Sequence, residues 1–589
     1  MKSRRRRANR RAGAAQPVAQ QPAVDEAVPA TADAAAEAVA SRPAQAVDAP
    51  EPSTDDPISD RWFWIGAFVV FVVAALIRLP ELGMNPFHHD EGVNGWFTTM
   101  LVRSGAWQYD PANYHGPTLF YFALVSEILF GLTNEAMRLV PVVFGLVTVA
   151  AIIGLRPVLG SIPALVGGLL LALSPGAVYV SRYFIHEALL VAFTMTLVAS
   201  ALLYLRSRNP AWALGVGASA ALIFATKETG VITVGVLVIA AVVSGIYVNW
   251  RTGGTPGLGS TRGGRRRASG AATSKPAKTV KIDGVEYRAV PDRSGRSLLD
   301  GVIPGGIPVD HVLASSIVFL CVYVLFFSSF FTNFPQGVVD SLATFTIWTQ
   351  TGGATQVAPP QQYLVWMATA DAPILILGTI GGILAAIQGR DRLWVFIGLW
   401  ALGITLAYSY ISYKTPWIAL NMLLPLALLG GFAIREAALL PRWRPVAVGA
   451  VVLATAASAF LAYDLNFVNY DTDSSRYPYV YVHSTREMLT MLDRIEDIAT
   501  EQGTGTDTGI TIVSPDYWPL PWYLRDYPKA GFWGRIEDVP LDQPIIIANT
   551  NQREQLAPLI AGQFEQAGTY KLRPGVDLDV YVRTAEPAS

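Results

Sequence analysis

Apolar segments long enough to cross a lipid bilayer recur along this chain, and they restrict its fold more than any other feature. A helix needs about 20 mostly apolar residues to span about 30 Å of hydrocarbon, where every backbone hydrogen bond must be satisfied internally. The sequence therefore predicts an α-helical polytopic membrane protein with about eleven transmembrane helices. The runs lie at 62–79, 139–155, 157–175, 187–205, 212–226, 229–248, 310–331, 372–388, 393–411, 417–434 and 445–463.

Two further points support a membrane fold. Apolar residues make up 52% of the sequence, which is high for a soluble protein. The first run starts too far along the chain, and is too long, for a cleaved signal peptide, so we expect it to remain as an anchor. A shorter apolar stretch at 117–133 carries Glu127, and we expect a helix at the membrane edge there.

Basic residues indicate which side each loop faces, because Lys and Arg collect in cytoplasmic loops. If the Arg-rich N-terminus is cytoplasmic, every second connection between the runs is basic, which places the protein in the cell membrane with its C-terminal segment outside. The charges total 44 Lys and Arg against 45 Asp and Glu, which gives no indication of a nucleic-acid partner. The basic positions of these connections are Arg156, Arg206, Arg208, Arg262, Arg265, Arg266, Arg267, Arg390, Arg392, Arg435, Arg442 and Arg444.

The remaining segments suggest five regions. We expect a disordered cytoplasmic tail at 1–60, an N-terminal transmembrane module at 61–249 with a first outer loop at 80–117, and a flexible cytoplasmic loop at 250–309. Transmembrane helices at 310–465 enclose an outer loop at 332–370, and 470–589 form a small extracytoplasmic α/β domain.

Local patterns predict elements within two of these regions. In the cytoplasmic loop, TVKIDGVEYRAV predicts a hairpin that turns at Asp283-Gly284, and the loop either touches anionic headgroups or is solvated filler. In the C-terminal region we expect helices at 485–501 and 551–561, and strands at GITIVS, PIIIAN and DLDVYVR.

Ionisable residues gather in the first outer loop, at His88, His89, Asp90, Glu91 and His115. A carboxylate near a low-dielectric boundary has a raised pKa, which suits a general base. Asp90 and Glu91 with His89 could instead hold a divalent cation, although HHDE lacks the spacing of a strong metal motif. A solvated loop without chemistry is the alternative. No other cofactor motif, such as a phosphate loop, occurs in a suitable setting.

Three further groups of polar residues lie at span ends. Arg182 and Glu187 follow the third run, and Lys227-Glu228 separates the fifth from the sixth. Ionisable groups at such places are costly and usually have a task, although local pairing would also explain them.

Lys414 lies between two apolar runs beside Tyr413 and Trp417. Aromatic residues at an interface often form only a belt. A cation among aromatic rings would also suit the phosphate and sugar of a lipid-linked substrate. The segment 332–370 looks like an amphipathic helix and a loop that could cover such a site.

The order of these motifs resembles the GT-C superfamily of polyprenyl-phosphate-dependent glycosyltransferases, which includes protein O-mannosyltransferases and the aminoarabinose transferase of lipid A. The shared features are the pair Asp90-Glu91, the turn HGPTLFY, EAMRLVP with Arg138, and Ser181-Arg182 followed by Glu187. More narrowly, HHDEGVNGWF, YHGP, SRYFIHEALL, YKTPW, PYVYVHST and PLPWYLRDY resemble a family associated with flippase activity in archaeal-type N-glycosylation.

This resemblance implies inverting transfer of a sugar from a polyprenyl-phosphate donor to a glycan, lipid or protein acceptor on the extracytoplasmic face. Asp90 would be the base, with Glu91 assisting it or holding a cation. The donor phosphate would be bound by Arg182, Lys227, Lys414 or Arg138, and the substrates would be contacted by His88, His89, His115, Glu187, Tyr413 and Trp417.

Two other classes of function compete with this one. A flippase or transporter component for lipid-linked sugars would use the same charges along a translocation path, but the predicted spans carry few charges at mid-membrane. A non-catalytic glycan-binding protein would use the aromatic residues of the C-terminal region, namely Tyr517, Trp518, Trp522, Tyr523 and Trp533.

Overall fold

The computed structural model describes residues 56–113, 115–252, 279–282, 285–288, 306–351, 357–472, 475–537 and 539–584. Most of the predicted N-terminal tail and cytoplasmic loop lies outside these residues. Within that loop, strands β1 (Thr279–Ile282) and β2 (Val285–Arg288) pair in antiparallel register, which confirms the hairpin. Its turn, Asp283-Gly284, lies outside the described residues.

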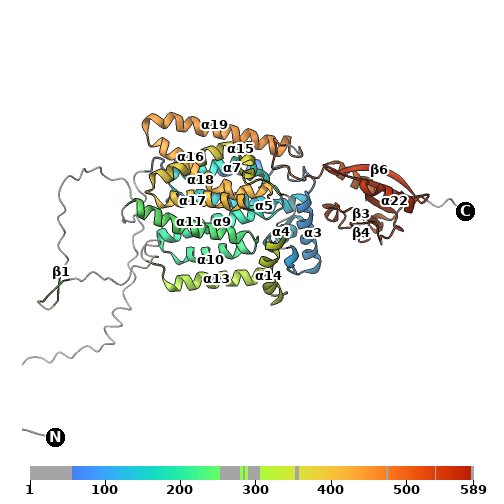
Figure 1. Cartoon of the computed structure of the whole chain (residues 1–589), viewed down its shortest axis with the longest axis horizontal. Coiled ribbons are helices and arrows are strands. Elements are labelled where there is room, and N and C mark those ends of the chain that lie inside the picture. Colours follow the sequence, from blue (N-terminus) through green and yellow to red (C-terminus); the bar gives the residue numbers. More distant parts are fainter. Residues whose placement is uncertain are drawn as a thin grey trace, which may run out of the picture. The chain divides into compact units, whose positions relative to one another are not determined.

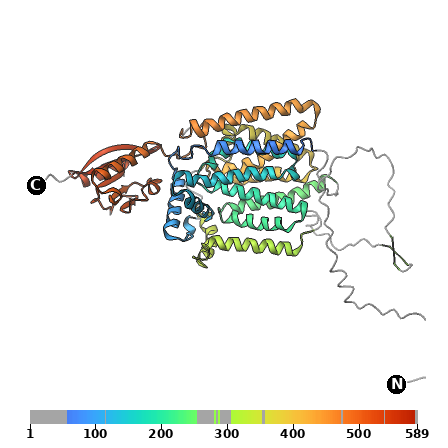
Figure 2. The same cartoon turned by 180° about the vertical axis from the view of Figure 1, so that it is seen from behind.

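Long apolar helices run side by side through most of the described chain (Figures 1 and 2). Eight of them are long and apolar enough to cross a membrane, among the residues that the structure describes. They contain the helices α2 (Asp60–Arg78), α5 (Asn134–Gly154), α9 (Glu187–Ser207), α11 (Gly230–Arg251), α13 (Val309–Phe327), α17 (Arg392–Tyr410), α18 (Leu420–Ala438) and α19 (Arg444–Tyr463). The polytopic helical fold is therefore confirmed.

Two predicted spans are bent helix pairs, which brings the number of candidate spans to at most 10 in the described chain. Helices α7 (Ser161–Leu173) and α8 (Pro175–Ser181) meet at 64°, and α15 (Gln362–Ala370) and α16 (Ala372–Gln388) meet at 117°. The remaining run, predicted at 212–226, forms α10 (Pro210–Phe224), which has 15 residues and is shorter than a typical span.

The two bends touch each other. Asp371, between α15 and α16, accepts hydrogen bonds from Ser174 Oγ at 2.6 Å and from the Gly176 backbone at 3.3 Å, both at the α7–α8 bend. Tyr479 donates a third, at 2.8 Å. A buried carboxylate is stabilised by such donors, so Asp371 ties both interrupted helices to the segment that leads into the C-terminal domain.

Helix α18 lies at the centre of the bundle, because every residue from Leu420 to Ile434 is buried. It packs on α7, α16 and α17. A Cβ at Gly381 would overlap the Leu429 carbonyl, and one at Gly431 would lie 2.6 Å from the Pro163 carbonyl. Small residues let membrane helices approach closely, so these glycines set the spacing around α18.

Shorter helices lie across one end of the long ones (Figures 1 and 2). Helix α3 (His89–Ser104) follows the first span, and α4 (Thr118–Phe130) is the apolar helix predicted at 117–133. Helix α14 (Gln336–Thr351) lies in the segment predicted to hold an amphipathic helix. The other short helical segments are η1 (Pro111–Asn113), α6 (Arg156–Leu159), η2 (Pro416–Ala419), η3 (Pro441–Trp443) and the π-turn η4 (Asp464–Val468).

The C-terminal region is a small domain with a five-stranded sheet in the order β4-β3-β5-β7-β6. Strands β3 (Ile510–Val513), β4 (Ala530–Trp533) and β5 (Ile545–Asn549) are parallel, and β6 (Phe564–Arg573) and β7 (Val576–Arg583) are antiparallel to their neighbours. Strands β3, β5 and β7 were predicted, as were α20 (Glu487–Glu501) and α22 (Arg553–Ile560). Strands β4 and β6, helix α21 (Leu520–Tyr523) and the one-turn segments η5 (Gly505–Asp507) and η6 (Thr550–Gln552) were not.

Candidate active site

The four residues HHDE form the N-cap and the first turn of α3, and their side chains make different contacts. His88 is the N-cap: its Nδ1 accepts a hydrogen bond of 3.1 Å from the Asp90 backbone. Glu91, at the third helical position, accepts one of 3.0 Å from the His88 backbone, which completes a capping box. His88 and Glu91 therefore turn inward and fix the helix end.

Glu91 is fully buried and its carboxylate is shared among several donors. Arg138, near the start of α5, donates two hydrogen bonds to this carboxylate, from Nε at 2.7 Å and from Nη2 at 2.6 Å. The Phe184 backbone adds a bond of 2.8 Å from the segment before α9. Bidentate, charge-assisted bonds of this kind are strong and directional. Glu91 thus joins α3, α5 and the start of α9.

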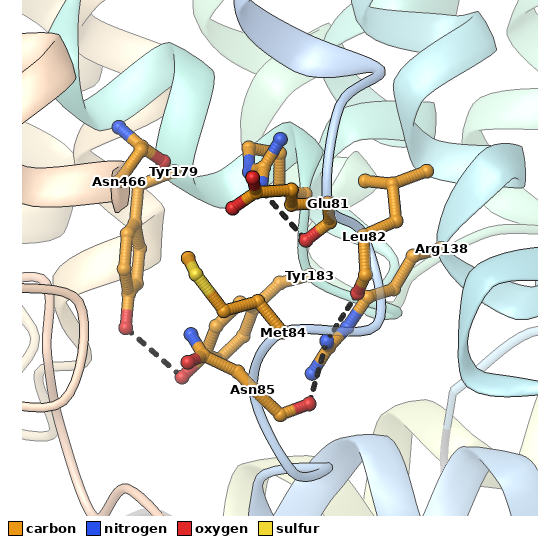
Figure 3. A pocket seen from close by; sticks show the side chains of 9 residues that line it. Glu81, Leu82, Met84, Asn85, Arg138, Tyr179, Tyr183 and Asn466 are labelled. Atoms are coloured by element: carbon orange, nitrogen blue, oxygen red, sulfur yellow. Dashed lines mark hydrogen bonds between the residues drawn. The ribbon is translucent and has the colours of Figure 1, made fainter. Parts of the chain in front are cut away.

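Arg138 also holds the loop that precedes α3. Its guanidinium donates to the carbonyls of Leu82 at 2.7 Å, Asn85 at 3.0 Å and Pro86 at 3.1 Å. With the two bonds to Glu91 this makes five, which is every N–H that an arginine side chain offers. Figure 3 shows Arg138 beside Leu82 and Asn85, among the residues that line a small recess of about 10 Å³, which is room for about one water molecule.

Asp90 differs from its neighbour. It is half-buried, and within the described chain no hydrogen bond or ion pair reaches its carboxylate. It occupies the second position of α3, where the positive end of the helix dipole favours a negative charge. Asp90 is therefore an ionisable group held on a fixed helix end with its acceptor oxygens unused.

Aromatic rings lie close to His88 and His89 at this turn. The His88 ring lies 5.8 Å from Trp417 and 5.4 Å from Tyr183, and the His89 ring lies 6.4 Å from Trp518 of the C-terminal domain. Burial lowers the pKa of His88 and His89 and outweighs the opposing attraction of Asp90. Both rings are therefore neutral at pH 7.

His483 belongs to the same surroundings. Its Nδ1 lies 3.2 Å from the Tyr183 hydroxyl, which in turn lies 3.1 Å from the Tyr179 hydroxyl. Figure 3 shows these two tyrosines side by side, with their hydroxyls joined. Burial, together with the nearby His88 and Arg138, lowers the pKa of His483 to about 3.

A second polar group forms where α9, α10 and α11 meet the turn before α4. Lys227 pairs with Glu187, and His115 lies 3.0 Å from Glu228. Burial lowers the pKa of Lys227, but Glu187 and Glu228 raise it by more, so the amine stays charged. Of the residues named from the sequence, the structure thus brings together Glu187, Lys227 and His115.

The turn HGPT is held tightly against this group. The Gly116 backbone donates to the Thr226 carbonyl at 3.1 Å, and the two hydroxyls of Thr118 and Thr226 lie 2.8 Å apart. A Cβ at Gly116 would overlap the Ala225 carbonyl. Glycine is required here by that close backbone approach.

The side chains of Arg182 and Lys414 do not pair with carboxylates in the described chain and instead donate hydrogen bonds to backbone carbonyls. Arg182 donates to Arg78 at 2.9 Å, Pro80 at 2.7 Å and Glu81 at 3.2 Å, so it holds the loop that leaves α2. Lys414 is 3% exposed and donates to three carbonyls at the end of α17, of Tyr408, Ser409 and Ile411. Tyr413, the residue before it, forms a single antiparallel β-bridge with Val357.

The possible divalent cation finds little support in this arrangement. Among the described residues there is no group of three or more His, Cys, Asp or Glu side chains placed to hold a metal ion. Glu91 is already bound by Arg138, and His88 uses its Nδ1 as a helix cap. Asp90 and His89 alone form a poor ligand set.

Comparisons with known proteins agree with this architecture. A family model described as dolichyl-phosphate-mannose-protein mannosyltransferase matches residues 114–255. The crystal structure of ArnT from Cupriavidus metallidurans bound to undecaprenyl phosphate matches with a TM-score of 0.59, at 16% identity, over 90% of this chain and 100% of that chain. The chain has the GT-C fold.

Two further structures were matched. The apo state of the same ArnT gives a TM-score of 0.57 at 16% identity, over 88% of this chain and 98% of that chain. The cryo-EM structure of the arabinofuranosyltransferase AftD from mycobacteria gives 0.46 at 12% identity, over 90% of this chain and 40% of that chain. None of the curated proteins matches. The narrower resemblance to a flippase-associated family stays a prediction.

Sequence reasoning missed several residues around this candidate site. His483 and Arg573 lie hundreds of residues from His88, and both contribute to its electrostatic surroundings. Tyr183 lies inside the quoted motif SRYFIHEALL but was passed over in favour of the charged residues beside it. Only the family motif PYVYVHST, which ends two residues after His483, gave a signal for that histidine.

Proposed function

We propose that this protein transfers a sugar from a polyprenyl-phosphate-linked donor to an acceptor hydroxyl, with inversion at the anomeric carbon. The GT-C fold and the likeness to an ArnT structure that holds undecaprenyl phosphate support this reaction class. The observation that carries the proposal is the contrast between Asp90, whose carboxylate is unused, and Glu91, which Arg138 holds.

In this reaction Asp90 accepts the proton of the acceptor hydroxyl while the oxygen attacks the anomeric carbon. The bond between that carbon and the phosphate oxygen breaks, and the polyprenyl phosphate leaves with the electron pair. A base on a fixed helix end keeps its position as the bond forms, which is the condition for efficient general-base catalysis. Glu91 contributes by holding the helix end and does not exchange a proton.

The phosphate leaving group needs positive charge close to it. The donors of Arg138 are all used, and Lys414 makes three bonds to carbonyls, so these two cations serve the loops that they hold. Among the described residues Lys227 makes one side-chain hydrogen bond, to Glu187, which leaves two of its three N–H groups for a ligand. We therefore assign the phosphate to Lys227.

Contacts to the sugar and the acceptor are assigned to the rings and polar groups around the two sites. His89 precedes Asp90 in the chain, and Trp417 contacts the His88 ring. His115 pairs with Glu228, next to Lys227, and Tyr413 precedes Lys414. The basic connections at the other ends of the spans favour an extracytoplasmic site, because such loops stay in the cytoplasm.

The test is sugar transfer in membranes that contain the full chain, using a panel of radiolabelled polyprenyl-phosphate sugars. We expect label to move to an acceptor fraction, with an anomeric configuration opposite to that of the donor by NMR. Transfer with retained configuration would refute the inverting mechanism. Absence of transfer from every donor, together with faster donor flipping across vesicles that contain the protein, would refute the enzyme and support a flippase component.

A further inference from the structure

A short helix of the C-terminal domain packs directly on the helix that carries Asp90. A Cβ at Gly92 of α3 would overlap the ring of Pro519, and one at Gly95 would lie 2.6 Å from the indole of Trp522. Trp522 is 1% exposed. The two glycines therefore form a flat surface on α3 that admits α21 at close range.

Hydrogen bonds fix α21 at this position. The Tyr523 hydroxyl accepts from the Phe87 backbone at 2.7 Å and from Asn134 Nδ2 at 3.1 Å. The Trp522 indole donates to Asn134 Oδ1 at 2.8 Å, so both polar atoms of that side chain are used. Arg525 donates to the Leu132 carbonyl at 2.8 Å. The domain thus contacts the chain immediately before the His88 cap and at the start of α5.

Phe87 connects this contact to the base. Its ring is fully buried and stacks on Trp522 at 5.0 Å on one side, with Arg138 5.1 Å from its centre. Its backbone N–H bonds to Tyr523, and the next residue caps α3. Asp90 is the third residue after Phe87, so movement of this backbone would displace the carboxylate.

We propose that the C-terminal domain positions the catalytic base, with Tyr523 as a positioning residue that acts on Asp90 through Phe87 and the His88 cap. This rests on the proposed function, in which Asp90 is the base. The domain is then part of the active centre, and it sets the geometry of α3 together with Glu91 and Arg138. Trp522 and Asn134 hold Tyr523 in register with Phe87.

The kinetic test uses Tyr523→Phe, which removes only the hydroxyl, in the full-length protein. We expect kcat to fall about tenfold, the equivalent of about 1.4 kcal/mol, with the KM for the donor unchanged. Tyr527→Phe is the matched control, because its hydroxyl makes no hydrogen bond in the described chain and lies in the same domain. It should keep the wild-type kcat.

A double-mutant comparison separates positioning from structure. If Tyr523 acts through Asp90, adding Tyr523→Phe to Asp90→Asn lowers the residual transfer by less than about twofold, because the effects are coupled. The same tenfold loss in both backgrounds would overturn the proposal. So would a Tyr523→Phe variant no slower than Tyr527→Phe.

A second measurement does not depend on activity. Amide hydrogen exchange should be about tenfold faster in Tyr523→Phe at residues 87–92, and unchanged in strands β3, β5 and β7. Unchanged exchange at residues 87–92 would overturn the proposal even if transfer fell. If the wild type transfers no sugar, the proposed function fails, while exchange still decides whether Tyr523 fixes this turn.

Discussion

At the scale of residues, the motif HHDE combines two structural side chains with two that face a site. His88 and Glu91 form the capping box, and Glu91 ties α3 to Arg138. His89 and Asp90 lie between them in the first turn and are half-buried. Two adjacent carboxylates of the same chemistry therefore have different environments, and within the described chain only that of Asp90 has no hydrogen bond or ion pair.

Glu91→Gln should act on stability. The change leaves the buried guanidinium of Arg138 without its counter-ion, and breaking a buried pair in this way costs about 3–5 kcal/mol. We expect a clearly lower midpoint of thermal unfolding for the purified variant in detergent. Glu565→Gln, on the exposed face of β6, is the control and should leave the midpoint unchanged. Equal midpoints for both variants would contradict the structural role of Glu91.

His483 should make stability depend on pH. Its pKa is about 3 in the folded protein and about 6.5 when unfolded, so below pH 6.5 the unfolded chain binds the extra proton. Stability from this group is therefore present above pH 6.5 and is lost as pH falls, by up to about 1.4 kcal/mol per pH unit. Unfolding midpoints at pH 7.5 and 5.5 should differ less in His483→Gln than in the wild type. An identical difference would count against a neutral, buried His483.

At the scale of elements, apolar length predicted the helices but could not reveal their bends. The α7–α8 and α15–α16 interruptions are held by Asp371, Ser174 and Tyr479, which are distant in sequence. Strand β4 reads AGFW and is too short to show alternation, and β6 reads FEQAGTYKLR, a mostly exposed edge strand. These bends and strands are determined by contacts between segments that are distant in sequence. Local sequence patterns carry no information about such contacts.

Gly92→Ala tests the contact between α3 and α21. The added methyl group would overlap Pro519, so the two elements must separate, with an expected cost of about 1–3 kcal/mol. Gly449→Ala is the control, because nothing lies near its Cβ position on α19 and alanine favours a helix. Thermal unfolding should show a loss for Gly92→Ala only. A stabilising effect of Gly92→Ala would show that this contact is looser than described.

At the scale of the whole molecule, the sequence predicted the polytopic helical fold, which this chain shares with an ArnT structure at only 16% identity. The sequence could not show which residues of the candidate site bind each other. Lys227 pairs with Glu187, which begins α9. From the C-terminal domain, Trp518 lies beside the His89 ring and Tyr523 accepts a hydrogen bond from the Phe87 backbone. Those pairings follow from packing across the bundle.

The proposed orientation is tested by labelling. In a Cys321→Ser background, Glu565→Cys reports on the C-terminal domain and Arg390→Cys on a basic connection. A membrane-impermeant maleimide applied to intact cells should label Glu565→Cys, and Arg390→Cys should react only after lysis. The reverse pattern would place the site in the cytoplasm.

The central claim, that Asp90 is the base, is tested most directly by the turnover of Asp90→Asn. At saturating donor, kcat should fall about 100- to 10,000-fold, while binding of the polyprenyl phosphate and the unfolding midpoint stay those of the wild type. Asp110→Asn, in the same loop and exposed, should transfer normally. Transfer by Asp90→Asn within a few-fold of the wild type would contradict the account.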